Sequence, residues 1–210
     1  MNQTAICNLA LLRLGINQQI ADITDASPQA RACNAVYDLC VESMLHERPW
    51  PFAVRQVDLA LVGTQLIADW YYTYRYPSSY LNVHRVIPTL VADDTTPVIY
   101  TAPPMAVDLD TYPFASGSDD DGGLIHTDVD DAIALGTVKV ADPSQYSPLF
   151  CSALAWYIAA EIAVSLTKDR GLYSNAYAQY EQKVSEAFSA AANEPKPRPD
   201  RDADMIRART

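Results

Sequence analysis

The segment SPLFCSALAWYIAAEIAVSLT, residues 147–167, is the most informative part of this sequence for predicting the fold. It is apolar on every side except at Glu161, and a run of about 20 apolar residues is long enough to cross a membrane. Its many alanines, the mid-segment Trp156 and Tyr157, and the central Glu161 favour instead a helix that other helices surround. We therefore expect a helix bundle and no membrane partner.

Three further helices are expected around this segment. The first spans residues 3–14 and is followed by Gly15, which fits a C-terminal cap. The second opens at the serine–proline pair 27–28, a capping hydroxyl followed by a first-turn proline, and ends before Pro49. The last spans residues 174–192. Their apolar side chains recur at helical spacing: Ile6, Leu9 and Ala10; Cys33, Val36, Tyr37, Cys40, Val41, Met44 and Leu45; Tyr177, Tyr180, Val184 and Phe188.

The corner RPWPF, residues 48–52, follows the second helix. Two prolines fix the backbone on either side of Trp50, so its ring should be held in one orientation. Trp50 and Phe52 are therefore candidate contact residues between subunits. The alternative, which we favour, is that Trp50 is a core side chain that closes the corner between helix and sheet, because buried tryptophan usually serves packing first.

Alternating residues predict strands between residues 70 and 87, with a bend after Pro77. A ladder of tyrosines at 72, 74 and 76 could stack on the bases of a nucleic acid. Such a platform needs lysines and arginines beside it, and this one lacks them. A cross-strand packing ladder is the favoured interpretation.

Residues 86–138 carry ten aspartates and no lysine or arginine. Prolines and glycines punctuate this stretch, so it should form short strands and loops, with strands at 124–127 and 132–140. The run DDDG at 119–122 lacks the ligand spacing of a calcium loop, and we interpret it as a solvated acidic loop. The candidate acidic residues of a channel or rim are Asp93, Asp94, Asp119, Asp120 and Asp121.

These patterns predict an α+β fold that is mostly α. A bundle of about four helices, from residues 1–48 and 147–192, should carry a small antiparallel β-region inserted between the second helix and the long helix 147–167. We place the β-rich insertion at 66–141 and treat residues 1–193 as a single domain. A chain of 210 residues has room for one sizeable core.

Residues 194–210, EPKPRPDRDADMIRART, have too little apolar content to fold alone and predict an extended C-terminal arm. The alternating prolines favour a stiff polyproline-like backbone. We expect the arm to dock on acidic surfaces of a neighbour; the alternative is a tail without a partner. Its candidate contact residues are Arg198, Arg201, Met205, Ile206, Arg207 and Arg209.

The overall charge of −11 argues against a protein that binds the phosphate backbone of a nucleic acid. No basic and apolar leader pattern opens the sequence, so we do not expect secretion. The four cysteines lack C-x-x-C spacing, and we expect them to be reduced and buried.

A catalytic constellation is not apparent in this sequence. The three histidines lie apart, without a G-x-S-x-G or H-E-x-x-H motif, and no phosphate-cradling glycine loop occurs. We therefore expect neither an enzyme nor a bound cofactor or metal.

Several segments, taken in order, resemble the head-to-tail adaptor proteins of tailed bacteriophages, the family of the podovirus tail tubular protein A. They are ICNLALLRLG at 6–15, the second helix with its Trp-Pro-Phe-Ala ending, the W-x-Y-x-Y-x-Y-P strand from Trp70, residues 124–128, and SPLFCSALAWYIAAEIA from Ser147. The likeness covers about residues 3–168. The chain departs from it at 134–137, ALGT, where a more aromatic strand is expected, and in an enlarged loop at 119–123.

The resemblance implies a structural virion protein at the portal–tail junction, made in the host cytoplasm. It would form a ring of twelve copies that joins the portal protein to the tail nozzle or tail tube protein, with tail fibres as a further candidate partner. DNA would pass through without specific binding, and part of residues 86–131 would face the lumen or its mouth, unless this region is an outward-facing solvated loop. Two alternatives are a virion-associated cell-wall hydrolase and a free-standing acidic binding module.

Overall fold

The computed structural model describes residues 1–89 and 112–192, and this portion of the chain contains four α-helices and two antiparallel sheets. The expected α+β class is confirmed. The elements in chain order are α1 (Gln3–Arg13), α2 (Pro28–Glu47), β1 (Val54–Asp58), β2 (Leu61–Ile67), β3 (Trp70–Arg75), β4 (Tyr80–Pro88), β5 (Phe114–Asp119), β6 (Gly122–Thr127), β7 (Ala132–Val138), the short 3-10 helix η1 (Pro143–Gln145), α3 (Pro148–Thr167) and α4 (Arg170–Ala192).

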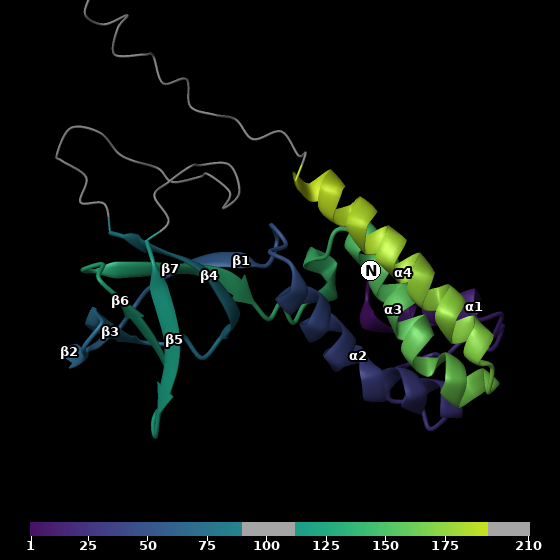
Figure 1. Ribbon diagram of the computed structural model, residues 1–210. Helices are drawn as coiled ribbons and strands as arrows, with labels where there is room; N and C mark the ends of the chain where they lie inside the picture. The colour runs from purple at the N-terminus through teal and green to yellow at the C-terminus, as the bar shows by residue number, and fades with distance from the viewer. Residues whose placement is uncertain (90–111, 193–210) are drawn as a thin grey trace, which may run out of the picture.

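Helices and strands lie at opposite ends of the molecule (Figure 1). We call α1–α4 the helical region and β1–β7 the β region. The chain enters the β region after α2 and returns to the helices after β7. Residues from both sides of the β region therefore share one core.

Local capping explains where the helices begin. The Oγ atoms of Ser27 and Ser147 accept hydrogen bonds from the backbone N–H groups of Ala30 and Phe150, at 3.1 and 3.2 Å, and a proline follows each serine. The predicted start of the last helix at residue 174 is wrong, because α4 already begins at Arg170. Asp169 accepts a hydrogen bond from the backbone N–H of Gly171 at 2.7 Å and so supplies a start signal that the tyrosine periodicity does not reveal.

The central element of the helical region is α3, which contacts α1, α2 and α4. Within the described residues it is the one helix long and apolar enough to span a membrane by composition. Ten of its residues are buried in the core, among them Phe150, Leu154, Ile158 and Ile162. Burial of this helix removes from water the large apolar surface that its sequence carries.

The β region consists of a three-stranded sheet in the order β1-β7-β4 and a four-stranded sheet in the order β2-β3-β6-β5. Val86 and Ala134 from the first sheet share a small core with Tyr74 and Ile125 from the second. The hydroxyl of Tyr74 donates a hydrogen bond to the carbonyl oxygen of Val129 at 2.9 Å. The middle of the tyrosine ladder is therefore a packing element, as favoured from the sequence.

The predicted start of the β-rich insertion at residue 66 is wrong. The strands begin at Val54, and the described residues form seven strands where a small β-region was expected. The first strand, β1, lies at a sheet edge and is mostly exposed, with Arg55 and Asp58 among its residues. An edge strand with little buried surface needs no alternation of apolar and polar residues. The sequence of β1 therefore lacks the alternation from which strands are predicted.

Candidate interaction surfaces

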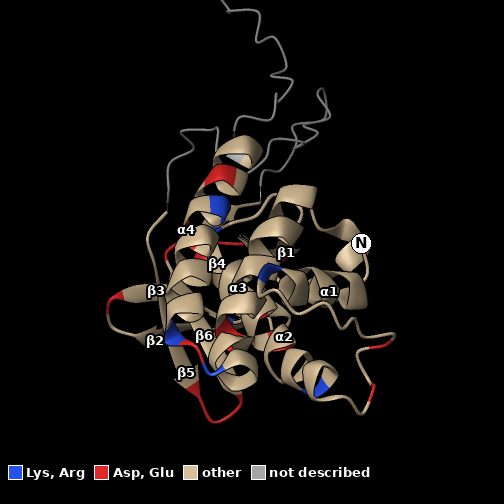
Figure 2. Ribbon diagram, turned by 90° about the vertical axis from the view of Figure 1, so that its right-hand side faces the viewer, with Lys and Arg blue, Asp and Glu red and all other residues tan. Residues whose placement is uncertain are grey.

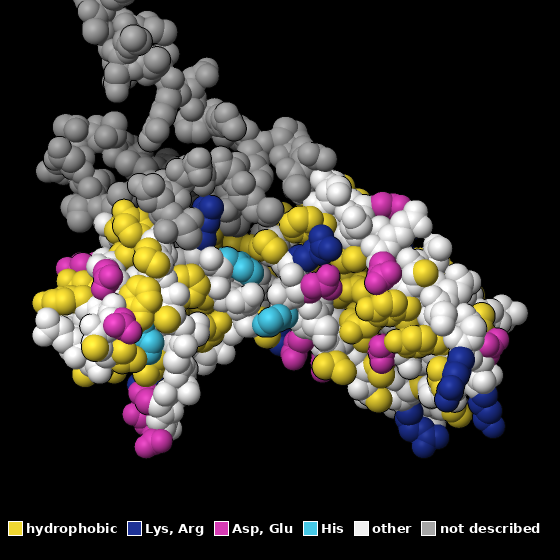
Figure 3. Space-filling view, in the orientation of Figure 1, with side chains coloured by type: hydrophobic (Ala, Val, Ile, Leu, Met, Phe, Trp, Pro, Cys, Tyr) yellow, Lys and Arg dark blue, Asp and Glu magenta, His cyan; other side chains and the backbone are white. Residues whose placement is uncertain are grey.

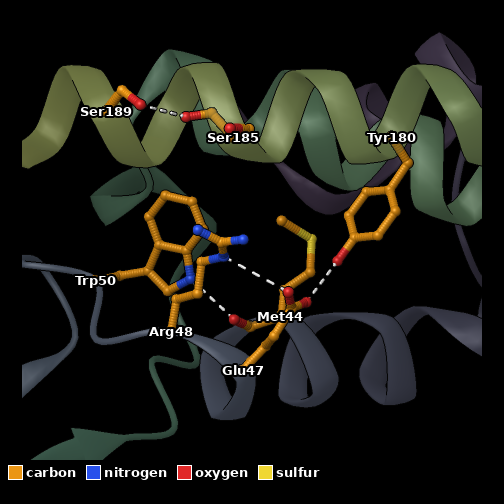
Figure 4. Close-up of polar contacts among 7 residues, drawn as sticks. All are labelled: Met44, Glu47, Arg48, Trp50, Tyr180, Ser185 and Ser189. Atoms are coloured by element: carbon orange, nitrogen blue, oxygen red, sulfur yellow. Dashed lines mark hydrogen bonds and ion pairs between the residues drawn. The ribbon is translucent and has the colours of Figure 1, made fainter.

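Trp50 lies in the core at the corner between the helical region and the β region (Figure 4). Its indole N–H donates a hydrogen bond to the carbonyl oxygen of Met44 at 2.8 Å, and its side chain is 1% exposed. The rings of Phe150 and Phe188 stand edge-on to it, with centroid distances of 4.9 and 6.0 Å. Half-buried Phe52 packs on Phe150 as well. This geometry agrees with the packing interpretation of Trp50, because the ring has almost no surface to offer another subunit.

Polar contacts beside Trp50 connect the end of α2 to α4 (Figure 4). The hydroxyl of Tyr180 donates a hydrogen bond to Glu47 Oε2 at 3.0 Å, and Arg48 Nε lies 3.5 Å from Glu47 Oε1. The Arg48 guanidinium also lies over the Phe188 ring, 5.1 Å from its centroid. Burial, together with the Glu47 charge, raises the pKa of Tyr180, so its hydroxyl remains a proton donor at neutral pH.

Four tyrosines on α3 and α4 form a continuous series of ring contacts, which we call the tyrosine stack. The rings of Tyr157 and Tyr180 are stacked at a centroid distance of 4.6 Å. Tyr177 contacts Tyr180 at 5.7 Å and is stacked on Tyr173 at 6.0 Å. The series runs from the buried Tyr180 to Tyr177 and Tyr173, which are 36% and 38% exposed. It therefore presents aromatic faces at the surface of the helical region.

Apolar side chains gather over the helical region between α2 and α4, with acidic side chains among them (Figure 3). Leu39 on α2 and Val164 on α3 are exposed, as is Glu161. The spacing of Tyr173, Tyr177 and Tyr180 places them on one helix face, but the sequence alone did not indicate that this face opens to solvent. An aromatic surface with carboxylates nearby suits a partner that is both apolar and basic.

A second exposed apolar surface lies on the β2–β3 hairpin, and we call it the hairpin patch. Its members are exposed by 41% to 60%: Leu61, Val62, Leu66, Ile67 and Tyr71. The strand β2 is an edge of the four-stranded sheet and carries no charged residue. Exposed, uncharged edge strands are sites where other chains can attach. Sequence reasoning missed this surface, although the run LVGTQLI is apolar enough to have indicated it.

The candidate acidic residues Asp119, Asp120 and Asp121 lie at the β5–β6 turn, which Figure 2 shows as a red loop beyond β5. Asp119 is already paired, because Arg75 Nη1 and Nη2 lie 2.6 and 3.1 Å from its two carboxylate oxygens. The Arg75 guanidinium lowers the pKa of this carboxyl group. Asp120 and Asp121 are exposed, and they remain the available charges of this loop.

The other predicted contact residues lie outside the described residues. These are the acidic candidates Asp93 and Asp94, and the arm residues Arg198, Arg201, Met205, Ile206, Arg207 and Arg209.

Chemically reactive side chains in the described ranges are buried or apart from one another. No group of three or more His, Cys, Asp or Glu residues in residues 1–89 and 112–192 is placed to hold a metal ion. The four cysteines are buried and unbridged, and burial raises the pKa of Cys40 to about 12, which keeps this thiol protonated at neutral pH. His126 Nδ1 lies 3.0 Å from Thr73 Oγ1, while its Nε2 faces Gly117 on β5. These positions favour structural roles for these side chains.

No protein-family model matches the chain, and no curated protein matches it.

Proposed function

We propose that this chain is a structural virion protein, one subunit of the head-to-tail adaptor ring that joins the portal to the tail of a bacteriophage. The observation that carries the proposal is the presence of two unlike exposed apolar surfaces, the tyrosine stack on the helical region and the hairpin patch on the β region. A closed ring is built from heterologous contacts, so each subunit needs two different surfaces that fit each other or a shared neighbour. The order of the segments that resemble tail tubular protein A supports the same assignment.

In this proposal the four helices form a bundle around α3 that serves as the rigid body of each subunit. The ring has about twelve copies, and the portal protein and the tail nozzle or tail tube protein attach to its two faces. The chain's charge of −11 suits a channel that DNA must leave freely, because carboxylates repel phosphates over the screening length of about 8 Å. Asp120 and Asp121 are exposed and are candidates for this role.

The test is to image the purified full chain by cryo-electron microscopy, alone and mixed with a bacteriophage portal protein, and to measure its mass by light scattering. We expect a closed ring on the portal. A chain that stays monomeric with and without portal would overturn the proposal. Lysis of cell-wall material in a zymogram would favour the hydrolase alternative instead.

A pair of variants makes this test specific. Leu66→Asp places a charge in the hairpin patch at a side chain that is 60% exposed, and it should prevent ring assembly without unfolding the subunit. Gln56→Asp places the same charge on β1, another exposed edge strand outside the patch, and should leave assembly intact. Equal assembly of both variants would exclude the hairpin patch as a ring contact.

A further inference from the structure

We propose that residues 193–210 of one copy dock on the tyrosine stack of a second copy. The inference rests on the self-association in the proposed function and deepens it by naming one contact between copies. It does not depend on which protein the ring attaches to.

The first argument is the chemistry of the surface. Tyr173 and Tyr177 on α4 are 38% and 36% exposed, and Val164 on α3, which contacts α4, is 43% exposed. Glu47 accepts the hydrogen bond from Tyr180 at the inner end of the series, and Glu161 is exposed one helical turn after Tyr157. The surface thus combines aromatic faces with carboxylates.

The second argument is the chemistry of the segment. Pro195, Pro197 and Pro199 alternate with Lys196 and Arg198, and the whole segment has five basic residues against four acidic ones. Aromatic grooves bind proline-rich strands in the polyproline II conformation, which loses little entropy on binding. Arginine guanidinium groups stack on aromatic rings as well.

The same pairing already occurs among the described residues of the molecule. The Arg13 guanidinium lies 4.4 Å from the centroid of the Trp156 ring, and Arg48 lies over Phe188. The helical region therefore uses arginine on aromatic rings twice in its own packing. The charges also favour a contact of the segment with the rest of a neighbouring chain. The segment has a net charge of +1, and the remaining residues have a net charge of −12.

The third argument is the distance that the segment must span. This distance favours docking on a second copy over docking on the tyrosine stack of the same chain. The helix α4 ends at Ala192, about 18 Å along the helix axis from Tyr180. A return to its own stack would need a sharp reversal within Asn193 and Glu194, yet the residue before a proline favours extended backbone. An extended segment of this length spans about 50 Å, enough to reach a neighbour.

The experiment uses the full chain in two isotopic forms, unlabelled and labelled with nitrogen-15. They are unfolded together in urea, refolded as a mixture, and treated with a carbodiimide, which joins a lysine amine directly to a carboxylate. Lys196 is the only lysine of the segment. We expect linked peptides that join Lys196 to Glu161 or Glu47 and contain one labelled and one unlabelled partner. Links within one isotope only, or no such links in a sample that forms rings, would overturn the docking while leaving the ring proposal standing.

Matched variants separate docking from general stability. The double variant Tyr173→Ala, Tyr177→Ala removes two exposed rings and should lower the yield of mixed-isotope links about tenfold, with little change in melting temperature. Tyr112, which pairs with Val86 of β4 in the β region, is 38% exposed, and Tyr112→Ala should leave the yield unchanged. Equal yields from the two variants would contradict the inference. A chain that remains monomeric at high concentration would overturn both the docking and the self-association on which it rests.

Discussion

The helical region and the β region differ in how they bury their apolar side chains. In the helical region a single core extends around α3 and includes large side chains such as Trp50, Phe150 and Leu154. In the β region the shared core is much smaller, and β2 leaves its apolar side chains in solvent. Because stability scales with buried apolar area, we expect the helical region to carry most of the folding free energy. The β region retains uncovered surface that suits contact with other chains.

The largest expected effect is that of removing Trp50. Trp50→Ala should lower the free energy of unfolding by about 3–5 kcal/mol, because it leaves a cavity among Phe150, Phe188 and Phe52 and frees the Met44 carbonyl oxygen. Urea unfolding followed by circular dichroism at the helical wavelength measures the loss.

Trp70→Ala is the control for this prediction. Trp70 is only half-buried on β3 of the hairpin, so its removal should cost clearly less. Equal losses for the two variants would contradict the view that the helical core dominates stability.

An intermediate effect is expected from Gly136 on β7. A Cβ atom at this position would collide with the carbonyl oxygen of Asn82 and would lie 2.6 Å from the Tyr80 ring, so only glycine fits between β7 and β4. This close approach explains the glycine within the ALGT sequence. Gly136→Ala should lower stability by about 1–3 kcal/mol.

Hydrogen exchange then tests whether the two regions open separately. Amides of β4 and β7 should lose protection in Gly136→Ala while those of α3 keep theirs. Gly171→Ala is the control, because the nearest atom to its Cβ is a movable Asp169 carboxylate oxygen at 3.1 Å, and it should be neutral or slightly stabilising. Uniform loss of protection in both regions would show that they unfold as one unit.

The smallest effect concerns pH and the boundary between the two regions. His84 on β4 is half-buried, and its Nε2 lies 2.7 Å from Thr137 Oγ1. Burial, and secondarily the charge of His46 on α2, lowers the pKa of His84. The unfolded chain therefore takes up a proton at this site before the folded chain does, and stability falls as pH drops below about 6.5.

Urea midpoints at about pH 7.5 and about pH 5.5 measure this effect. His84→Gln keeps a hydrogen-bonding side chain without the titration, so it should lose less stability over this interval than the natural sequence. His46→Gln should fall between the two. An identical pH dependence for all three proteins would rule out His84 as the group responsible.

The candidate surfaces could be predicted only partly from the sequence. The sequence shows Tyr177 and Tyr180 at helical spacing, and this spacing indicated that both pack in the core. In the structure, the position of α4 against α3 buries Tyr180 and leaves Tyr177 exposed. The acidic run at 119–121 was visible too, yet the pairing of Asp119 with Arg75 joins residues 44 positions apart. Charge patterns along the chain do not reveal such pairs.

Local sequence features were sufficient to predict α2 and α3, because caps, prolines and helical periodicity act over a few neighbouring residues. Ser27, Ser147 and the all-round apolar segment 147–167 were sufficient to place α2 and α3 and to require that α3 be buried. The arrangement of the two sheets became known from the structure, in which Val57 of β1 pairs with Ala134 of β7 and Tyr74 of β3 pairs with Ile125 of β6. Strand pairing and surface exposure depend on contacts between distant segments, and no local pattern specifies which segments meet.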